Sequence, residues 1–178
     1  MAPGQAILHR LISWADVIIH NSLDDTASRM GITQEILKAI NPNIVSCQIS
    51  CLGGTKRGGW EDRPGFDHLV QAISGMMSHY GSLENPQAHG ATASGDTMGG
   101  LALAYGALLG VYQQRTKGVA SEVRTSLAQA VNNIQFPYMI SENGHSDWGE
   151  PHGQFATGPH WWQRLYACRD GWIYVGTR

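Results

Sequence analysis

The sequence is poor in the features that mark several large classes of protein. Its 12 Lys and Arg residues against 14 Asp and Glu leave a formal net charge of -2, so no basic excess points to nucleic acid. No apolar run reaches the ~18 residues that a membrane span needs. Residues 1–20 also lack the basic start and the cleavable apolar core of a signal peptide. We therefore expect a globular, cytoplasmic protein that binds neither nucleic acid nor membrane.

Common ligand-binding motifs are missing as well. The eight histidines show no HExxH or similar spacing, and no His or Cys pair completes a zinc pattern with Cys47 and Cys51, so we expect no metal. Together with Cys168 these cysteines are odd in number, and we interpret them as reduced, buried thiols. No G-x-G-x-x-G follows a strand, which disfavours a dinucleotide-binding oxidoreductase.

What the sequence does contain is an alternation of helix and strand patterns. Residues 4–15 carry apolar side chains at helical spacing, and 16–20 form a short strand-like run. A second helix is predicted over 33–40, with Thr33 as a candidate N-cap, and a second strand over 43–50. Helices and strands in this order indicate an α/β fold with parallel strands.

The rest of the chain continues this pattern and then changes. A glycine-rich loop at 51–65 is long enough to favour a functional role. The predicted elements after it are a helix over 66–80, a long helix over 96–116, a strand over 120–126, a helix over 127–144 and a hairpin over 164–177. The chain opens on a helix without earlier strands and closes on a two-stranded hairpin, which is marginal alone. We therefore expect it to be a piece of a longer protein.

Five motifs follow one another in a familiar order. They read "ADVIIHNSLDDTASRMGIT", "INPNIVSCQISCLGG", "DRPGFDHLVQAISGMM", "SGDTMGGLALAYGALLGVYQQRTKG" and "EVRTSLAQA". Each is weak alone, but their succession resembles the class III CoA-transferases, the family of formyl-CoA transferase and carnitine CoA-transferase that also includes α-methylacyl-CoA racemase. The resemblance covers about residues 5 to 176.

The resemblance implies an architecture. Residues 1–145 would be the later part of a Rossmann-like large domain that binds coenzyme A and carries the catalytic residue. Residues 146–164 would be a linker with an active-site loop, and 165–178 the first hairpin of a small α+β domain. Family members form interlocked dimers, so the resemblance implies a homodimer. It also implies acyl-CoA and a small carboxylic acid as substrates, with no permanently bound cofactor.

Asp96 is the residue to which the resemblance gives the central role. It is the only acid in residues 91–110, and Gly95 and the pair Gly99-Gly100 flank it. In the transferases the matching acid is the nucleophile that forms an anhydride and then an aspartyl-CoA thioester. Amides at a helix N-terminus favour a carboxylate anion even when it is partly desolvated, which suits this chemistry. The alternative from the residues alone is an ordinary N-cap, and one residue can do both.

Further site residues follow from the resemblance. Asn21 stands where the family closes a strand against coenzyme A, although the sequence reads "HNS" and lacks the family's aromatic residue. Arg29 and Met30 match a basic-apolar pair that borders the nucleotide. An arginine there could pair with a phosphate of CoA or with the acceptor carboxylate, the alternative being a solvated residue at a helix end.

The acyl and acceptor groups are expected near four other residues. Phe66 and Asp67 match an aromatic-acid pair of the transferases, whereas the racemases carry a catalytic His at the position of Phe66. His68 lies two places further on, so the racemase alternative is weakened but stays open. Gly153 and Gly158 stand where formyl-CoA transferase has a longer glycine run, which implies a different acyl or acceptor group. A third alternative is an inactive piece that serves only as a dimerisation partner.

Overall fold

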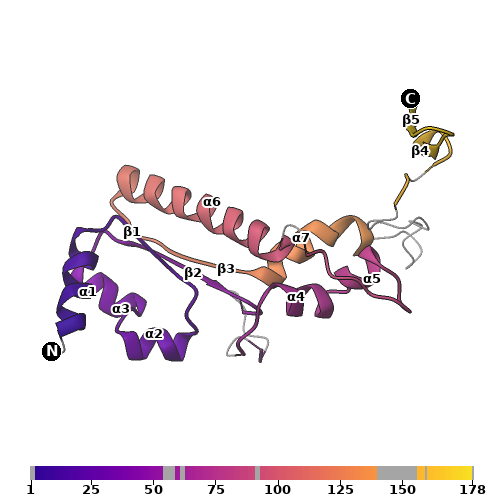
Figure 1. Ribbon diagram of the computed structural model, residues 1–178. Coiled ribbons are helices and arrows are strands. Elements are labelled where there is room, and N and C mark those ends of the chain that lie inside the picture. Colours follow the sequence, from indigo (N-terminus) through magenta and orange to yellow (C-terminus); the bar gives the residue numbers. More distant parts are fainter. Residues whose placement is uncertain are drawn as a thin grey trace.

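A three-stranded parallel sheet forms the centre of the fold (Figure 1). The computed structural model describes residues 3–53, 59–60, 63–90, 93–139, 156–158 and 160–177. The strands lie in the order β1 (Val17–His20), β2 (Val45–Ser50) and β3 (Glu122–Ser126). In the register, Ile18 pairs with Ser46 and Cys47 pairs with Val123. The three strands fall where the sequence predicts them, and the parallel α/β fold class is confirmed.

Three helices cover one face of this sheet. They are α1 (Pro3–Trp14), α2 (Asp24–Met30) and α3 (Gln34–Ile40), which lie below the strands in Figure 1. One buried cluster joins apolar side chains of these helices with one residue between α2 and α3 and one that precedes β2: Ile12, Ala27, Ile32, Leu37 and Ile44. Sequence patterns predict α1 and α3 but not α2. Thr33 does stand at the N-cap of α3, yet its side chain makes no capping hydrogen bond.

The long helix α6 (Ser94–Lys117) covers the opposite face (Figure 1). Val45 and Cys47 of β2 pack against Leu103 and Ala107 of this helix. Glycines allow the close approach: a Cβ added at Gly106 would lie 2.5 Å from Cγ1 of Val123 on β3. The other side of α6 is also apolar but exposed, at Met98, Leu101, Tyr105, Leu108, Leu109 and Tyr112.

Two helices replace the single helix that the sequence predicts over 66–80. The structure has α4 (Asp67–Ile73) and α5 (Met76–Tyr80), so the prediction of one helix is wrong. Gly75 separates them with φ 79°, in the left-handed region that an α-helix does not use. Together with α7 (Leu127–Met139), α4 forms a third buried cluster, which includes Cys51, Val70 and Val131.

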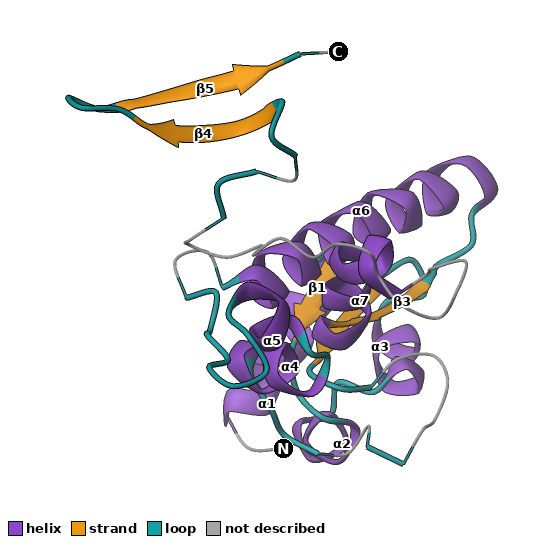
Figure 2. Cartoon of the chain, turned by 90° about the vertical axis from the view of Figure 1, so that its right-hand side faces the viewer, coloured by secondary structure: helices purple, strands orange, loops and turns teal. Residues whose placement is uncertain are grey.

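A separate two-stranded antiparallel hairpin follows, made by β4 (Gln163–Ala167) and β5 (Trp172–Gly176). It confirms the predicted hairpin, with Asp170 and Gly171 in the turn. Figure 2 shows it set apart from the sheet and helices. Cys168 is exposed here, contrary to the expectation of a buried thiol, whereas Cys47 and Cys51 are buried and free. Most of the expected linker, residues 146–155, lies outside the described residues.

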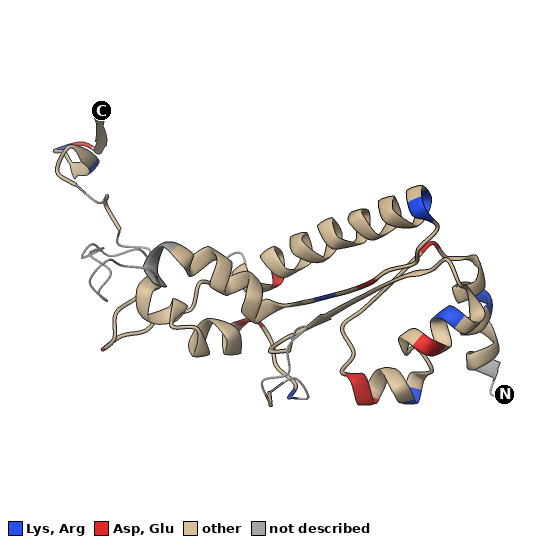
Figure 3. Ribbon diagram, turned by 180° about the vertical axis from the view of Figure 1, so that it is seen from behind, with Lys and Arg blue, Asp and Glu red and all other residues tan. Residues whose placement is uncertain are grey.

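Charges are sparse on α6. Figure 3 shows this helix in tan, the colour of uncharged residues, between a red acidic residue at its start and blue basic residues at its end. These are Asp96 in the first turn and Arg115 and Lys117 in the last, which complements the helix dipole at both ends.

Within the described residues, no helix combines the length and apolar character that a membrane crossing requires.

Candidate active site

Asp96 lies in the first turn of α6, with its side chain exposed. The helix begins at Ser94, and the N-cap position belongs to Ala93, whose φ of 41° is left-handed and whose side chain makes no capping bond. Asp96 is therefore not the N-cap that the sequence leaves open as an alternative. Its carboxylate projects from the positive end of the longest helix in the described chain, where an anion is favoured.

The cap of α6 comes instead from another helix. Oδ1 of Asp67, the first residue of α4, accepts hydrogen bonds from the backbone N–H groups of Gly95 at 2.6 Å and Asp96 at 3.1 Å. Its Oδ2 accepts one from Nε2 of Gln71 at 2.5 Å. Asp67 is only 3% exposed. The resemblance to the transferases names Asp67 from its position in the motif, but the sequence gives no sign that its carboxylate caps the helix of Asp96.

A ring of polar contacts surrounds this cap. Gln71 also donates to the backbone oxygen of His89 at 3.2 Å and accepts from the backbone N–H of His89 at 2.8 Å. The Ser94 hydroxyl lies 2.7 Å from Nδ1 of the His89 ring. The ring of Tyr80 contacts His89 edge to face, with 4.7 Å between centroids. The network thus runs from α4 through residue 89 back to the start of α6.

Partial loss of hydration and a neighbouring charge raise the pKa of Asp96. Although the residue is exposed, its carboxylate is partly desolvated, which is the main cause of the raised pKa. The negative charge of Asp67 raises the pKa of Asp96 further, and His68 acts in the opposite direction. The pKa of the Cys51 thiol is raised by burial and then by the charges of Asp96 and Asp67. A carboxylate with a raised pKa is more basic, and therefore more nucleophilic, than an ordinary aspartate.

The glycines beside Asp96 have defined packing roles. A Cβ added at Gly95 would lie 2.7 Å from Oδ1 of Asp67 and 3.2 Å from Cγ2 of Val131. At Gly99 it would lie 2.8 Å from Cδ2 of Leu127. Gly100, by contrast, has nothing within 4 Å. Gly95 and Gly99 therefore let the first turn of α6 seat closely against α4 and α7.

The remaining predicted site residues fall into two groups. Asp67 lies at the start of α6, where it accepts the hydrogen bonds of Gly95 and Asp96, and Phe66 directly precedes it with an exposed side chain. Asn21 follows the carboxyl end of β1, and Arg29 and Met30 end α2 with exposed side chains. The structure thus places these three residues around α2, apart from the cap.

Arg29 and Gly158 have local contacts that bear on their expected roles. Arg29 donates from Nη2 to Oγ1 of Thr26 at 3.0 Å and stays exposed. Gly158, before β4, has φ 142°, and a Cβ there would lie 2.3 Å from the backbone oxygen of Gln163. Gly153 lies outside the described residues. Where side chains are described, no three His, Cys, Asp or Glu residues gather as a metal site would require.

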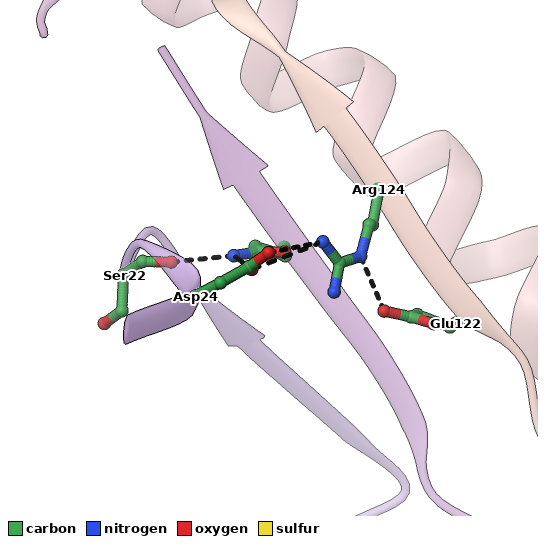
Figure 4. Close-up of polar contacts among 5 residues, drawn as sticks. Ser22, Asp24, Glu122 and Arg124 are labelled. Carbon is green, nitrogen blue, oxygen red and sulfur yellow. Dashed lines mark hydrogen bonds and ion pairs between the residues drawn. The ribbon is translucent and has the colours of Figure 1, made fainter. Parts of the chain in front are cut away.

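A polar pocket on the other face of the sheet escaped prediction. Gln48 of β2 donates to Oδ1 of Asp24 at 2.9 Å, and Arg124 of β3 lies 3.2 Å from Asp24 and 2.6 Å from Glu122 (Figure 4). The pocket measures about 230 Å³. The sequence signal for this pocket is the alternation of polar and apolar residues in "SCQIS" and "EVRTS". Strands that are buried on both faces rarely alternate in this way, so the alternation indicates polar side chains on one face of the sheet.

Two further side chains line this pocket and carry buried atoms without a hydrogen-bond partner in the described structure. They are Nδ1 of His20 and both amide atoms of Gln34. Burial and the charge of Arg124 lower the pKa of His20, with Asp24 acting in the opposite direction. The pocket therefore offers both donors and acceptors, on the sheet face away from α6.

Known proteins match this chain over nearly its whole length. The profile of CoA-transferase family III matches residues 1–178. CoA-transferase/lyase DddD of Marinomonas sp. (strain MWYL1) is 33% identical over 172 residues, which are 97% of this chain and 20% of that protein. Succinyl-CoA:glutarate CoA-transferase of Homo sapiens is 29% identical over 178 residues, which are 97% of this chain and 39% of the relative.

A third relative and a solved structure agree with these matches. (R)-2-hydroxy-4-methylpentanoate CoA-transferase of Clostridioides difficile is 33% identical over 97% of this chain and 42% of its own length. A CAIB/BAIF family protein from Brucella suis superposes with a TM-score of 0.80 and 22% identity, over 99% of this chain and 46% of that chain. The chain thus spans less than half the length of these relatives.

Proposed function

Because the chain belongs to CoA-transferase family III, we propose that the whole protein moves coenzyme A from an acyl-CoA donor to a carboxylic acid through Asp96. The single observation that supports this role is the exposed carboxylate of Asp96 on the first turn of α6, beside the buried carboxylate of Asp67. The relatives are named for different acyl and acceptor acids, so the proposal names the substrates by class: an acyl-CoA and a small carboxylic acid.

The proposed reaction needs no external oxidant or base. The Asp96 carboxylate attacks the thioester carbonyl, the C–S bond breaks, and the CoA thiolate leaves behind a mixed anhydride. The thiolate then attacks the aspartyl carbonyl, which releases the donor acid and forms an aspartyl-CoA thioester. The acceptor carboxylate repeats these two steps in reverse, so that acyl-CoA forms and Asp96 regains its charge.

The other site residues of the proposed enzyme form two groups, one that would contact coenzyme A and one that would border the acyl and acceptor groups. Asn21, Arg29 and Met30 around α2 would contact coenzyme A, with the exposed guanidinium of Arg29 pairing with a phosphate. Phe66, Asp67, Gly153 and Gly158 would border the acyl and acceptor groups. Coenzyme A is a substrate in this scheme, and no permanent cofactor is part of it.

We also propose that the protein is a homodimer and cytoplasmic. The exposed apolar side chains along the outer side of α6 support association, since such a stripe is typical of an interface. The two buried free thiols, Cys47 and Cys51, agree with a reducing compartment.

Labelling of Asp96 during turnover tests the proposed reaction. In the whole protein, Asp96→Asn and Asp96→Ala should reduce acyl exchange to background, while Asp16→Asn, at an exposed position before β1, leaves it unchanged. Hydroxylamine added during turnover should convert Asp96 to a hydroxamate, detected by peptide mass spectrometry. Label at another residue would contradict the role of Asp96. Rapid α-deuteration of a branched acyl-CoA in deuterated water would show a racemase instead.

A further inference from the structure

We propose that Asp67 is a positioning residue, which caps α6 from α4 and thereby holds the carboxylate of Asp96 in its attacking orientation. This inference rests on the proposed function, in which Asp96 is the nucleophile. It adds a role for Asp67 that the resemblance does not imply, because the family motif suggests only proximity to the substrate. Asp67 itself need not contact substrate for this role.

The start of α6 depends on Asp67 for its hydrogen bonds. The first four N–H groups of an α-helix have no partner within the helix, and a side chain at the N-cap usually accepts one or two of them. Ala93 occupies the N-cap and has no side-chain oxygen. The carboxylate of Asp67 therefore takes over this task for the N–H groups of Gly95 and Asp96 itself. Asp96 is thus held through its own backbone.

The position of the Asp67 carboxylate is itself constrained. Gln71, one turn along α4, holds its second oxygen at 2.5 Å, and Gln71 is in turn fixed by two hydrogen bonds to the backbone of His89. Both Asp67 and Gln71 are almost fully buried. A buried polar network with every member paired is rigid, so it transmits the packing of α4 to the first turn of α6.

The charge of Asp67 acts on Asp96 in addition to the cap. The groups that face Asp96 are Asp67 and His68 from α4 and Cys51 from the segment after β2. Helix α7, which also packs against α6, has no Asp, Glu, His, Lys or Arg in its sequence. The acid limb of the pH profile is the range in which kcat falls as Asp96 becomes protonated. Because the charge of Asp67 raises the pKa of Asp96, removing that charge shifts this limb to lower pH. Removing the charge of His68 shifts it to higher pH.

Two variants of Asp67 separate the charge from the cap. Asp67→Asn retains an oxygen that can accept from the two amides but loses the charge, whereas Asp67→Ala loses both. For Asp67→Ala in the whole protein we expect kcat to fall by about 10- to 100-fold while KM for acyl-CoA changes little, because the first turn of α6 loses its cap. For Asp67→Asn we expect a smaller fall in kcat and a shift of the acid limb of kcat to lower pH. His68→Gln, an exposed neighbour, should move the limb in the opposite direction.

Amide hydrogen exchange provides a readout that does not depend on turnover. Exchange in the peptide over residues 93–98 should be about tenfold faster in Asp67→Ala than in the wild type, and much less affected in Asp67→Asn. If both Asp67 variants fail to fold, the wild type alone still tests the cap. The N–H groups of Gly95 and Asp96 should then exchange much more slowly than the uncapped first-turn amides of a helix, because Asp67 accepts both of them. Rapid exchange of these two amides in the wild type would contradict the proposal.

The outcomes distinguish this inference from the proposed function. One possible outcome is a hydroxamate at Asp96 together with Asp67 variants whose kcat, pH limb and amide exchange are unchanged. This outcome would overturn the positioning role of Asp67 and leave Asp96 as the nucleophile. Faster exchange in Asp67→Ala without label at Asp96 would overturn the proposed function but support the cap. A rise in KM at constant kcat in Asp67→Asn would assign Asp67 to substrate binding and also overturn the positioning role.

Discussion

At Gly95, both the close packing of α6 and the cap by Asp67 require a residue without a side chain. A methyl group at this position would come 2.7 Å from the Asp67 oxygen that caps α6. Since the carboxylate and Val131 are both buried, neither can move away freely. We predict that Gly95→Ala lowers the free energy of unfolding by about 1–3 kcal/mol, which urea denaturation of the purified protein would measure.

Gly100 is the matched control for this prediction, because it lies in the same helix and nothing approaches its added Cβ. Gly100→Ala should stabilise the protein by up to about 1 kcal/mol, as alanine is the better helix former. If Gly95→Ala were equally stabilising, the close contact between Asp67 and the first turn of α6 would be refuted.

Elements were predictable where local pattern and tertiary packing agree. The strands at Val17–His20 and Val45–Ser50 are short runs that combine apolar and β-branched residues. Helix α6 is a long segment rich in leucine and alanine between its glycines, so local pattern indicates all three elements. The helix α2 was missed because its sequence, DDTASRM, has no apolar periodicity and buries only Ala27. Its available signals were two acids in the first turn and Gly31 just beyond its end.

The candidate site was predictable only in part, for a similar reason. The motif order identifies Asp96, but nothing local shows that its helix lacks a cap of its own or that Asp67 supplies one. That contact joins residues nearly thirty positions apart, so only the packing of α4 against α6 creates it. The polar pocket around Asp24 and Arg124 also depends on contacts across the sheet, 100 residues apart in sequence.

The break between α4 and α5 leads to a prediction at the same scale. Gly75 has φ 79° and open space around it, so an added methyl group would meet no atom but would force an unfavourable backbone conformation. We predict that Gly75→Ala destabilises the protein by about 1–2 kcal/mol in thermal or urea unfolding. Gly4→Ala, in helical backbone on α1 and equally uncrowded, should not destabilise. Equal effects of the two substitutions would refute the strain at Gly75.

At the scale of the whole molecule, the unusual feature is a helix that is apolar on two sides. The inner side of α6 packs on the sheet, and the outer side exposes Leu101 and Leu108 at 61% and 70%. Burying such a side chain is worth about 1.5–3 kcal/mol, so the outer stripe favours association of two chains. A monomer, whose stripe stays exposed to water, lacks the stabilisation that burial of these side chains provides.

We predict that the protein self-associates through this stripe and that the double variant Leu101→Lys/Leu108→Lys weakens association at least ~100-fold, from the loss of two buried leucines per chain. Sedimentation velocity over a range of concentrations measures this, and far-ultraviolet circular dichroism checks that the helices persist. Ala39→Lys, an exposed position on α3 at the other face of the sheet, adds one charge without touching the stripe and should associate like the wild type. A wild type that stays monomeric at all concentrations would refute the interface. A double variant that associates as tightly as the wild type would show that the contact lies on another surface, because two buried lysines could not be tolerated in the centre of an apolar interface.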